Sequence, residues 1–271
     1  MLSAPPCVLT IAGSDSSAGA GVQADLKTIT ALDCYGLTAV TCVVSEIPGK
    51  VSRIQPLDGE MVADQIRLLG EAFPIAAAKT GMIGGRAQME AVIGAWRPLA
   101  VRGLPLVVDP VMIATSGARL LDEDAVQMME RELFPLARVI TPNLDEARAL
   151  FGGLIDSPEA MERAAHGLSQ RHGCGVLLKG GHLGGEEARD VLVHEGGVTW
   201  FASPRVPAVR THGTGCALSA AIACELAQGR TLVEAVGEAK AFISAAIVEH
   251  FRWSGGRGEI DALNHFATRR G

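Results

Sequence analysis

Short apolar runs alternate along this chain with stretches whose apolar residues recur at helical spacing. These runs do not alternate between apolar and polar residues, as a strand with one solvent-exposed face does. They therefore predict strands that are buried on both faces. They lie at Val8–Ile11, Leu37–Val44, Ala76–Lys79, Leu106–Asp109, Val139–Thr141 and Gly175–Lys179. Continuous apolar strands separated by helices form parallel sheets covered on both faces. The pattern therefore predicts one α/β domain over residues 1–271, built on a single doubly wound, mostly parallel sheet.

Capping and turn residues mark several element ends. Asp58 is a predicted N-cap for a helix that runs to Phe73, and Ser157 followed by Pro158 predicts another helix that runs to His172. The remaining elements are a hairpin and a series of helices. The hairpin joins Arg189–Val193 to Val198–Phe201, and the helices run to Leu32, over Arg86–Leu99, over Asp122–Leu133, and to Gln228 and Glu249.

Charge and cysteine content limit the binding partners and the cellular compartment that we expect for this protein. Among 271 residues, 24 Lys and Arg face 30 Asp and Glu, for a net charge of −6, which argues against a nucleic-acid or anionic-membrane surface. No apolar run approaches the roughly 18 residues of a membrane span, and the N-terminus lacks a basic leader region. The six cysteines include no CxxC pair, and no histidine pattern is typical of a zinc site. We expect a cytoplasmic protein.

One glycine-bracketed turn opens directly into a helix at Thr211–Ala221. Backbone N–H groups of Gly213, Thr214 and Gly215 would then converge on one point, and the helix dipole would make that point an anion site suited to a phosphoryl group. Cys216 lies at the helix start, where the dipole lowers the pKa of a thiol. The alternative is an ordinary glycine turn beside a buried cysteine. His212 is interpreted as a structural hydrogen-bonding residue.

A second glycine-rich stretch, Gly13–Asp25, follows a strand and opens a helix. It contains G-x-G-x-x-A, and Glu46 ends the next strand, where a dinucleotide fold places its ribose-binding acid. A nicotinamide-dependent oxidoreductase is therefore an alternative. Against it, the residues Gly13–Ala18 intervene between the strand and the glycine pair. The chain also lacks a Walker A sequence.

Acids and an amide follow other predicted strands. Asp109 ends one strand, and Asn143 and Glu146 stand three residues apart at a helix start. Hard oxygen atoms beside phosphates are the ligands that Mg²⁺ needs. The alternative for Asn143 and Glu146 is a capping box. Lys179 ends a buried strand, so it is expected to face the site.

Together these segments resemble the hydroxymethylpyrimidine/phosphomethylpyrimidine kinases of the ribokinase-like superfamily. The similar segments occur in family order from about Val8 to the last helix. They are Ile11–Asp15, Gly19–Lys27, Lys79–Met82, Val108–Met112, Ser116-Gly117, Thr141–Asn143 with Glu146, Lys179–His182, His212–Cys216 and Leu263–Phe266.

The resemblance implies ATP-dependent phosphorylation of the hydroxymethyl group of 4-amino-5-hydroxymethyl-2-methylpyrimidine, and then of the monophosphate, in thiamine biosynthesis. It also implies Mg²⁺ as cofactor and a homo-oligomer, most simply a dimer. The implied roles are Cys216 as catalytic base, Gly213, Thr214 and Gly215 as anion hole, Asp109, Asn143 and Glu146 for Mg²⁺, Lys179 and Lys240 for ATP, and Gly13, Asp25, Met82 and Val111 for the pyrimidine.

One position departs from the family pattern. The family's second strand ends in Ala-Gln-Asn-Thr, whose glutamine pairs with the pyrimidine, whereas this chain has Ser45-Glu46-Ile47-Pro48-Gly49. Glutamine offers a donor and an acceptor, but ionised Glu46 offers acceptors alone. Relatives that phosphorylate pyridoxal also differ here. A pyridoxal or pyridoxine kinase is therefore the alternative within the fold, and a non-catalytic pyrimidine-binding protein is a further one.

Overall fold

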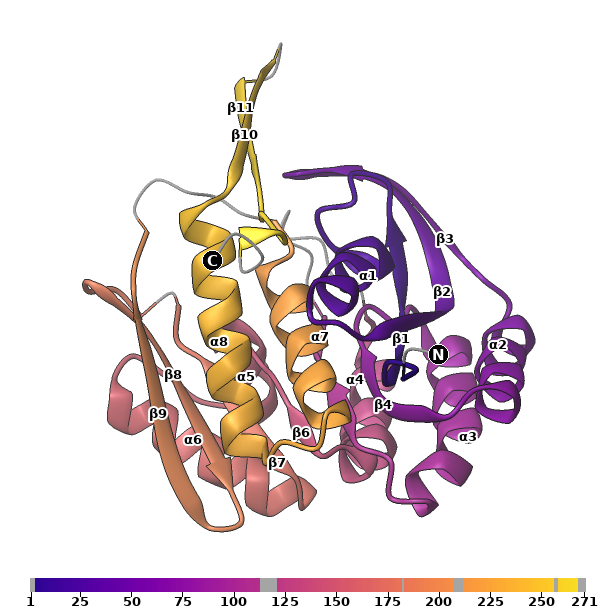
Figure 1. Cartoon of the computed structure of the whole chain (residues 1–271). Coiled ribbons are helices and arrows are strands. Elements are labelled where there is room, and N and C mark those ends of the chain that lie inside the picture. Colours follow the sequence, from indigo (N-terminus) through magenta and orange to yellow (C-terminus); the bar gives the residue numbers. More distant parts are fainter. Residues whose placement is uncertain (1–2, 113–120, 182, 207–211, 256–257, 268–271) are drawn as a thin grey trace.

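The computed structural model describes residues 3–112, 121–181, 183–206, 212–255 and 258–267. A nine-stranded sheet runs through it in the order β3-β2-β1-β4-β5-β6-β7-β8-β9 (Figure 1). The strands are β1 Cys7–Asp15, β2 Tyr35–Ile47, β3 Lys50–Pro56, β4 Ile75–Thr80, β5 Leu106–Val108, β6 Val139–Ile140, β7 Gly175–Lys179, β8 Glu187–His194 and β9 Gly197–Pro204. Neighbours from β2 to β7 pair in parallel, and β3, β8 and β9 pair antiparallel at the two edges. The predicted doubly wound, mostly parallel sheet is confirmed.

Helices cover both faces of the sheet. One face carries α1 Gly21–Ala31, α7 Thr214–Ala227 and α8 Leu232–Val248; the other carries α2 Gly59–Ala72, α3 Arg86–Val101, α4 Glu123–Met128, α5 Leu144–Phe151 and α6 Pro158–His172 (Figure 1). Alternate strand residues enter separate cores. Val107 packs with α7 and α8, whereas Leu106 and Val108 pack in the core of α2 to α6. Burial on both faces explains why these strands read as continuous apolar runs.

The predicted helix caps are present. The Asp58 carboxylate accepts the Glu60 N–H at 2.7 Å at the start of α2. The Ser157 hydroxyl accepts the Ala160 N–H at 3.2 Å, with Pro158 as the first residue of α6. The predicted hairpin is also present as β8 and β9.

Three strands fall outside the predicted pattern. Strand β3 is an edge strand whose residues are all exposed or partly exposed, and its Val51 and Ile54 are separated by polar residues, so it carries no apolar run. Strands β10 Phe251–Gly255 and β11 Gly258–Ala262 form a hairpin that stands away from the sheet (Figure 1). All five residues of β10 are exposed. An apolar pattern in a strand results from burial, and these three strands are little buried. Their sequences therefore carry no pattern that would predict them.

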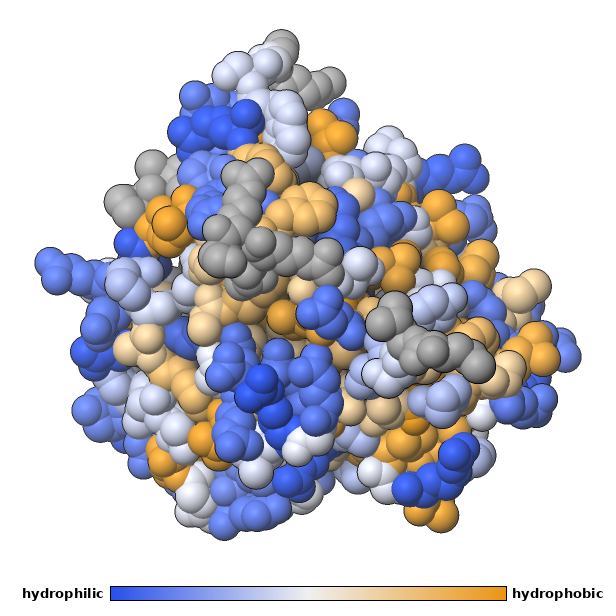
Figure 2. All heavy atoms as spheres, in the orientation of Figure 1, coloured by the Kyte–Doolittle hydropathy of each residue, from blue (hydrophilic) through white to orange (hydrophobic). Residues whose placement is uncertain are grey.

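Hydrophilic and hydrophobic side chains are intermixed on the face that Figure 2 shows. Among the residues that the structure describes, no helix is both long and apolar enough to cross a membrane.

The predicted site residues lie within the described ranges. The family-like residues Ser116, Gly117 and His182, together with Thr211, lie outside them.

Candidate active site

Three of the predicted site residues, Asp109, Asn143 and Lys179, lie at the carboxyl ends of the parallel strands β5, β6 and β7 or just after them. The chain leaves β1 toward β2 on one side and later returns to β4 on the other, so β1 and β4 flank the point where the winding reverses. Ligands bind at this position in doubly wound sheets. Helix α7 begins here and packs against β4, β5 and β1.

The turn that opens α7 lies directly on the loop that follows β1. Gly213 is the N-cap of α7 and has a φ of 84°, a left-handed conformation that favours glycine. A Cβ added to Gly213 would overlap the backbone carbonyl of Gly19. The first turn of α7 therefore has its position because two glycine loops approach each other without side chains.

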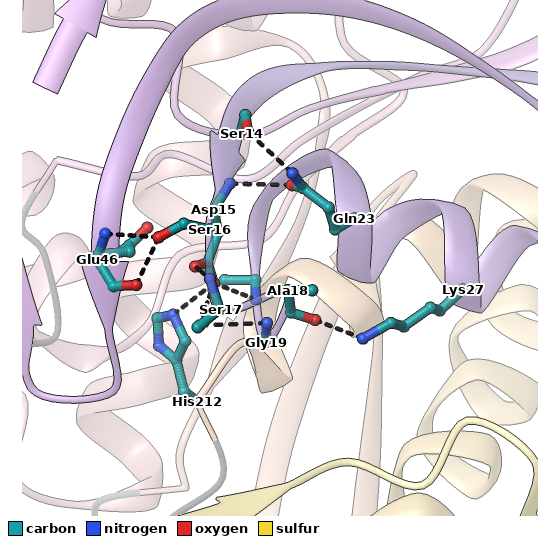
Figure 3. A network of polar contacts seen from close by, with 11 residues as sticks. Ser14, Asp15, Ser16, Ser17, Ala18, Gly19, Gln23, Lys27, Glu46 and His212 are labelled. Atoms are coloured by element: carbon teal, nitrogen blue, oxygen red, sulfur yellow. Dashed lines mark hydrogen bonds and ion pairs between the residues drawn. The ribbon is translucent and has the colours of Figure 1, made fainter.

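A hydrogen-bond network fixes the same two loops together (Figure 3). Asp15 is buried and accepts the Ser17 and Ala20 N–H groups at 2.7 and 2.8 Å, and His212 lies 3.1 Å away through Nε2. Burial alone would raise the pKa of Asp15, but the hydrogen bonds from His212, Ser17 and Ala20 lower it to about 2. Nε2–H of His212 donates to this carboxylate, so the hydrogen bonding predicted for His212 is present, and its structural role stays a prediction.

Glu46 belongs to the same network. The Ser16 hydroxyl donates to the Glu46 carbonyl at 2.7 Å and accepts its N–H at 2.8 Å, which joins the end of β2 to the loop. Ligand atoms of Asp15, Glu46 and His212 lie within 4.8 Å of one another. Burial opposes protonation of His212, but the hydrogen bond and charge of Asp15, with the charge of Glu46, raise its pKa. The imidazole ring of His212 thus lies close to two carboxyl groups.

Cys216 lies in the first turn of α7 and is half-buried. Burial raises the pKa of the thiol to about 11, although Lys79 and the Gly21 N–H act to lower it. The predicted lowering of this pKa is wrong, because the loss of hydration around sulfur outweighs the lowering by the charge of Lys79 and by Gly21.

A second charged group stands beside the turn. Lys179, at the end of β7, donates to the Asp109 carboxylate at 2.9 Å, and Thr141 donates to the same oxygen at 3.1 Å. The Lys179 ammonium lies 3.1 Å from the point where a Cβ on Gly215 would stand. A cation and the N-terminus of α7 therefore face one small volume, an arrangement that suits a phosphate.

A family model described as phosphomethylpyrimidine kinase matches residues 15–261. This chain belongs to that family. A hydroxymethylpyrimidine/phosphomethylpyrimidine kinase of Rhizobium meliloti is 42% identical over 259 residues, which cover 95% of this chain and 96% of the relative. A bifunctional thiamine biosynthesis protein of Geobacter sulfurreducens is 43% identical over 240 residues, and this chain spans 49% of its length. The protein is a phosphotransferase, which decides against the oxidoreductase alternative.

Solved structures share the whole fold. Pyridoxal kinase from Bacillus subtilis, in complex with ADP, superposes with a TM-score of 0.89 at 35% identity and covers 99% of this chain and 100% of its own. Phosphomethylpyrimidine kinase from Clostridium difficile superposes with a TM-score of 0.78 at 37% identity and covers 89% of this chain and 99% of its own. The ribokinase-like architecture expected from the resemblance is confirmed.

In this family member, Asn143 and Glu146 form the capping box of α5. The Asn143 side chain accepts the Glu146 N–H, and the Glu146 carboxylate accepts the Asn143 N–H, both at 2.9 Å. The capping alternative is therefore confirmed, and a metal role for the pair stays a prediction. Burial raises the pKa of Glu146. The positive charge of Lys179 acts to lower this pKa, and the charge of Asp109 acts to raise it further.

Two of the residues predicted for the pyrimidine lie together. The Gly13 N–H donates to the Met82 carbonyl at 2.9 Å, and a Cβ on Gly13 would stand 3.7 Å from the Met82 sulfur. Val111 lies two residues beyond Asp109 and donates its N–H to the Asp109 carbonyl at 2.8 Å. Their contact with a substrate stays a prediction.

Asp25 and Lys240 have other partners in this structure. Asp25 is fully buried, and both of its carboxylate oxygens accept from Lys79. Lys240 donates to Asp190 at 2.5 Å and to the Ala188 carbonyl at 3.0 Å on β8. Their predicted roles in substrate and ATP binding stay predictions. Lys79 carries no assigned role in the sequence analysis, although it ends an apolar run in the same way as Lys179 does.

Proposed function

We propose that this kinase transfers the γ-phosphoryl group of ATP to the hydroxymethyl group of 4-amino-5-hydroxymethyl-2-methylpyrimidine, and then phosphorylates the monophosphate. The proposal is supported by the Rhizobium meliloti relative, which carries this name and matches along 95% of the chain. ADP in the Bacillus subtilis neighbour supports ATP as the phosphoryl donor. The observation that carries the proposal is the Lys179 ammonium beside the glycine turn of α7.

The proposed transfer uses three parts of the chain. Cys216, as thiolate, accepts the proton of the substrate hydroxyl; the oxygen forms a bond to the γ-phosphorus, and the bond from that phosphorus to the ADP oxygen breaks. Negative charge on the transferring group meets the N–H groups of Gly213 to Gly215 and the ammonium of Lys179. Lys240 would lie farther along the nucleotide. Base catalysis contributes a rate enhancement of about 10²–10⁴-fold. We therefore expect the positioning of the reacting groups to contribute at least as much to the rate.

The acidic residues beside the turn fit a magnesium ion. Asp109 and Glu146 are both buried, Lys179 donates to Asp109, and the charges of Lys179 and Asp109 both act on the Glu146 carboxyl group. Two carboxylates with one ammonium leave negative charge for a cation, and the Asn143 amide adds a third hard oxygen. These residues would hold Mg²⁺, which neutralises phosphate charge when bound.

A second candidate substrate is pyridoxal or pyridoxine. Two observations favour it: the Bacillus subtilis pyridoxal kinase superposes along the whole chain, and Glu46 stands where the pyrimidine kinases of the family pattern have glutamine. Burial and the charge of Asp15 raise the pKa of Glu46, so a protonated Glu46 would regain the donor that a glutamine has. Pyrimidine specificity is therefore compatible with a glutamate at this position.

A side-by-side kinase assay decides the substrate. Hydroxymethylpyrimidine, its monophosphate, pyridoxal and pyridoxine are compared by kcat/KM for the wild type, Glu46→Gln and a control, Glu71→Gln, on the exposed surface of α2. We expect the pyrimidine to exceed pyridoxal by about tenfold or more, since one lost polar contact costs at least that much. Higher kcat/KM for pyridoxal in the wild type would overturn the proposed substrate. Unchanged selectivity in Glu46→Gln would show that Glu46 does not contact the ring.

We also propose that the enzyme works in the cytoplasm as a homodimer. All six cysteines of the chain, each within the described residues, are free thiols, as is usual in a reducing compartment. Light scattering of the purified protein tests the dimer, and a mass of one chain would contradict it.

A further inference from the structure

Two carboxyl groups and one imidazole meet where three segments far apart in the sequence come together (Figure 3). Asp15 ends β1, Glu46 lies near the end of β2, and His212 directly precedes the N-cap of α7. Nε2 of His212 lies 3.1 Å from Oδ2 of Asp15, and the ligand atoms of all three residues lie within 4.8 Å of one another. The proposed transfer assigns no task to Asp15 or His212.

The spacing between His212 and Asp15 is close to that of two ligands on one metal ion. Zinc bonds to imidazole nitrogen and carboxylate oxygen are about 2.0–2.2 Å long, which at a tetrahedral angle places the two ligand atoms about 3.3–3.6 Å apart. The observed 3.1 Å therefore needs only a small widening. The Glu46 carboxyl group, no more than 4.8 Å away, can complete the set by a side-chain rotation.

Hydrogen bonds hold Asp15 in place and leave the Glu46 carboxyl group able to turn. The buried Asp15 carboxylate accepts the Ser17 and Ala20 N–H groups at 2.7 and 2.8 Å, and the Ser17 hydroxyl at 3.0 Å. Contacts of this kind orient a metal ligand and strengthen its bond. Glu46 is fixed through its backbone by the Ser16 hydroxyl, and no described residue donates a hydrogen bond to its half-buried carboxyl group.

The donor set and the charge select the kind of ion. One imidazole nitrogen with two carboxylate oxygens suits Zn²⁺ and the neighbouring first-row divalent metals, whereas Mg²⁺ and Ca²⁺ prefer oxygen ligands alone. Two ionised carboxyl groups balance a divalent charge. Lys27, the ammonium that Figure 3 shows beside the network, donates to the Ala18 carbonyl at 2.7 Å and not to either carboxyl group.

We propose that Asp15, Glu46 and His212 form a binding site for a divalent transition-metal ion of the zinc class. The ion takes the place of the proton that lies between Nε2 of His212 and Asp15. The ring then carries its proton on Nδ1, which has no hydrogen-bond partner in the described part of the chain. Three protein ligands leave the fourth position to a water molecule. The site is separate from Asp109, Asn143 and Glu146, the residues predicted for Mg²⁺.

Zinc affinity tests the site directly. The Kd for Zn²⁺ is measured by competition with a chromophoric chelator, in excess Mg²⁺ so that sites made of oxygen ligands are filled. We expect the wild type to bind Zn²⁺, and the Kd to rise about tenfold or more in Glu46→Gln and in His212→Asn. Circular dichroism checks that each variant is folded.

His194→Asn is the matched control. The His194 side chain is 14% exposed, as is that of His212, and its Nε2 lies 3.0 Å from the Glu195 carboxylate. The other neighbour of this nitrogen is the Arg138 guanidinium, also at 3.0 Å, where the proposed site has a second carboxyl group. The Kd for Zn²⁺ should therefore be unchanged in His194→Asn.

Cobalt(II) in place of zinc identifies the ligands. An ion held by nitrogen and oxygen gives d–d absorption in the visible range, without the thiolate-to-cobalt charge-transfer band that a cysteine ligand adds. We expect d–d bands in the wild type and in His194→Asn, and their loss in Glu46→Gln.

Three outcomes would overturn the proposal: no zinc binding by the wild type, a Kd in Glu46→Gln equal to that of the wild type, or a cobalt spectrum dominated by the thiolate band. If His212→Asn does not fold, Glu46→Gln decides alone, because the Glu46 carboxyl group accepts no hydrogen bond from the described residues whose loss could unfold the chain. Neither ATP nor pyrimidine is present in these measurements, so their result is independent of the kinase assay.

Discussion

Replacing Gly213 by alanine tests whether the turn at the start of α7 performs phosphoryl transfer. The φ of 84° at Gly213 costs an alanine about 1–2 kcal/mol, because its Cβ approaches the following carbonyl. A Cβ there would also overlap the Gly19 carbonyl and stand 3.0 Å from the Ala20 Cα. The neighbouring atoms are backbone, so no side chain can rotate away, and one of the two loops must move.

The size of the effect follows from what that movement displaces. Loss of one correctly placed N–H donor costs about 10²–10³ in kcat in other oxyanion sites. We therefore expect Gly213→Ala to lower kcat about a hundredfold or more. KM for the pyrimidine should change much less, since the pyrimidine is predicted to bind on the β1 and β4 side of the turn.

Gly229→Ala is the matched control. Gly229 follows α7 with a φ of 86°, and a Cβ added there meets nothing within 4 Å. It carries the same backbone penalty of about 1–2 kcal/mol without the overlap. We therefore expect Gly229→Ala to lose about that much stability and to keep its kcat, whereas Gly213→Ala should lose more stability as well as kcat. ADP release with hydroxymethylpyrimidine measures kcat, and urea unfolding measures stability. Equal kcat values for the two alanine variants would refute a role of the turn in the transfer.

Three further predictions concern other parts of the molecule. His212→Asn should lose about 1–2 kcal/mol near or below pH 6.5; because the folded-state pKa of His212 is raised, this loss should shrink as pH rises through that pKa. Urea unfolding across pH measures it, and a pH-independent loss would contradict it. Trp96→Ala, in the fully buried part of the core, should cost about 3–5 kcal/mol in the same assay, and a loss comparable to a surface substitution would contradict the packing. Asp109→Asn should raise the Mg²⁺ concentration for half-maximal activity about tenfold or more, whereas an unchanged Mg²⁺ titration would remove Asp109 from the metal site.

The central strands of the fold could be predicted because burial on both faces requires apolar residues at successive positions. Val107 faces the α7 side while Leu106 and Val108 face the α3 side, and only an apolar run satisfies both cores. Local caps were predictable for a similar reason. Asp58 and Ser157 bond to N–H groups two and three residues away, so no tertiary contact is needed to recognise them.

The electrostatics of the site could not be predicted in the same way. A helix start predicts a lowered thiol pKa for Cys216, but the opposite result comes from burial, which depends on α1, β4 and α7 meeting around the sulfur. Lys79 poses the same difficulty. Its partner Asp25 is 54 residues away, and nothing local in the apolar run of β4 distinguishes a buried lysine from an exposed one.

The glycine pattern of the β1–α1 loop has a structural cause that differs from dinucleotide binding. A Cβ on Gly19 would stand 3.0 Å from Cδ2 of His212, and the Gly19 carbonyl lies against Gly213. The space beside Gly19 that a pyrophosphate would need in a dinucleotide site is therefore filled by the loop that opens α7. Asp15, which holds His212, fixes that loop in place. G-x-G-x-x-A in this chain serves to receive a second loop, and the N-terminus that faces the predicted phosphate is that of α7, some 190 residues later along the sequence.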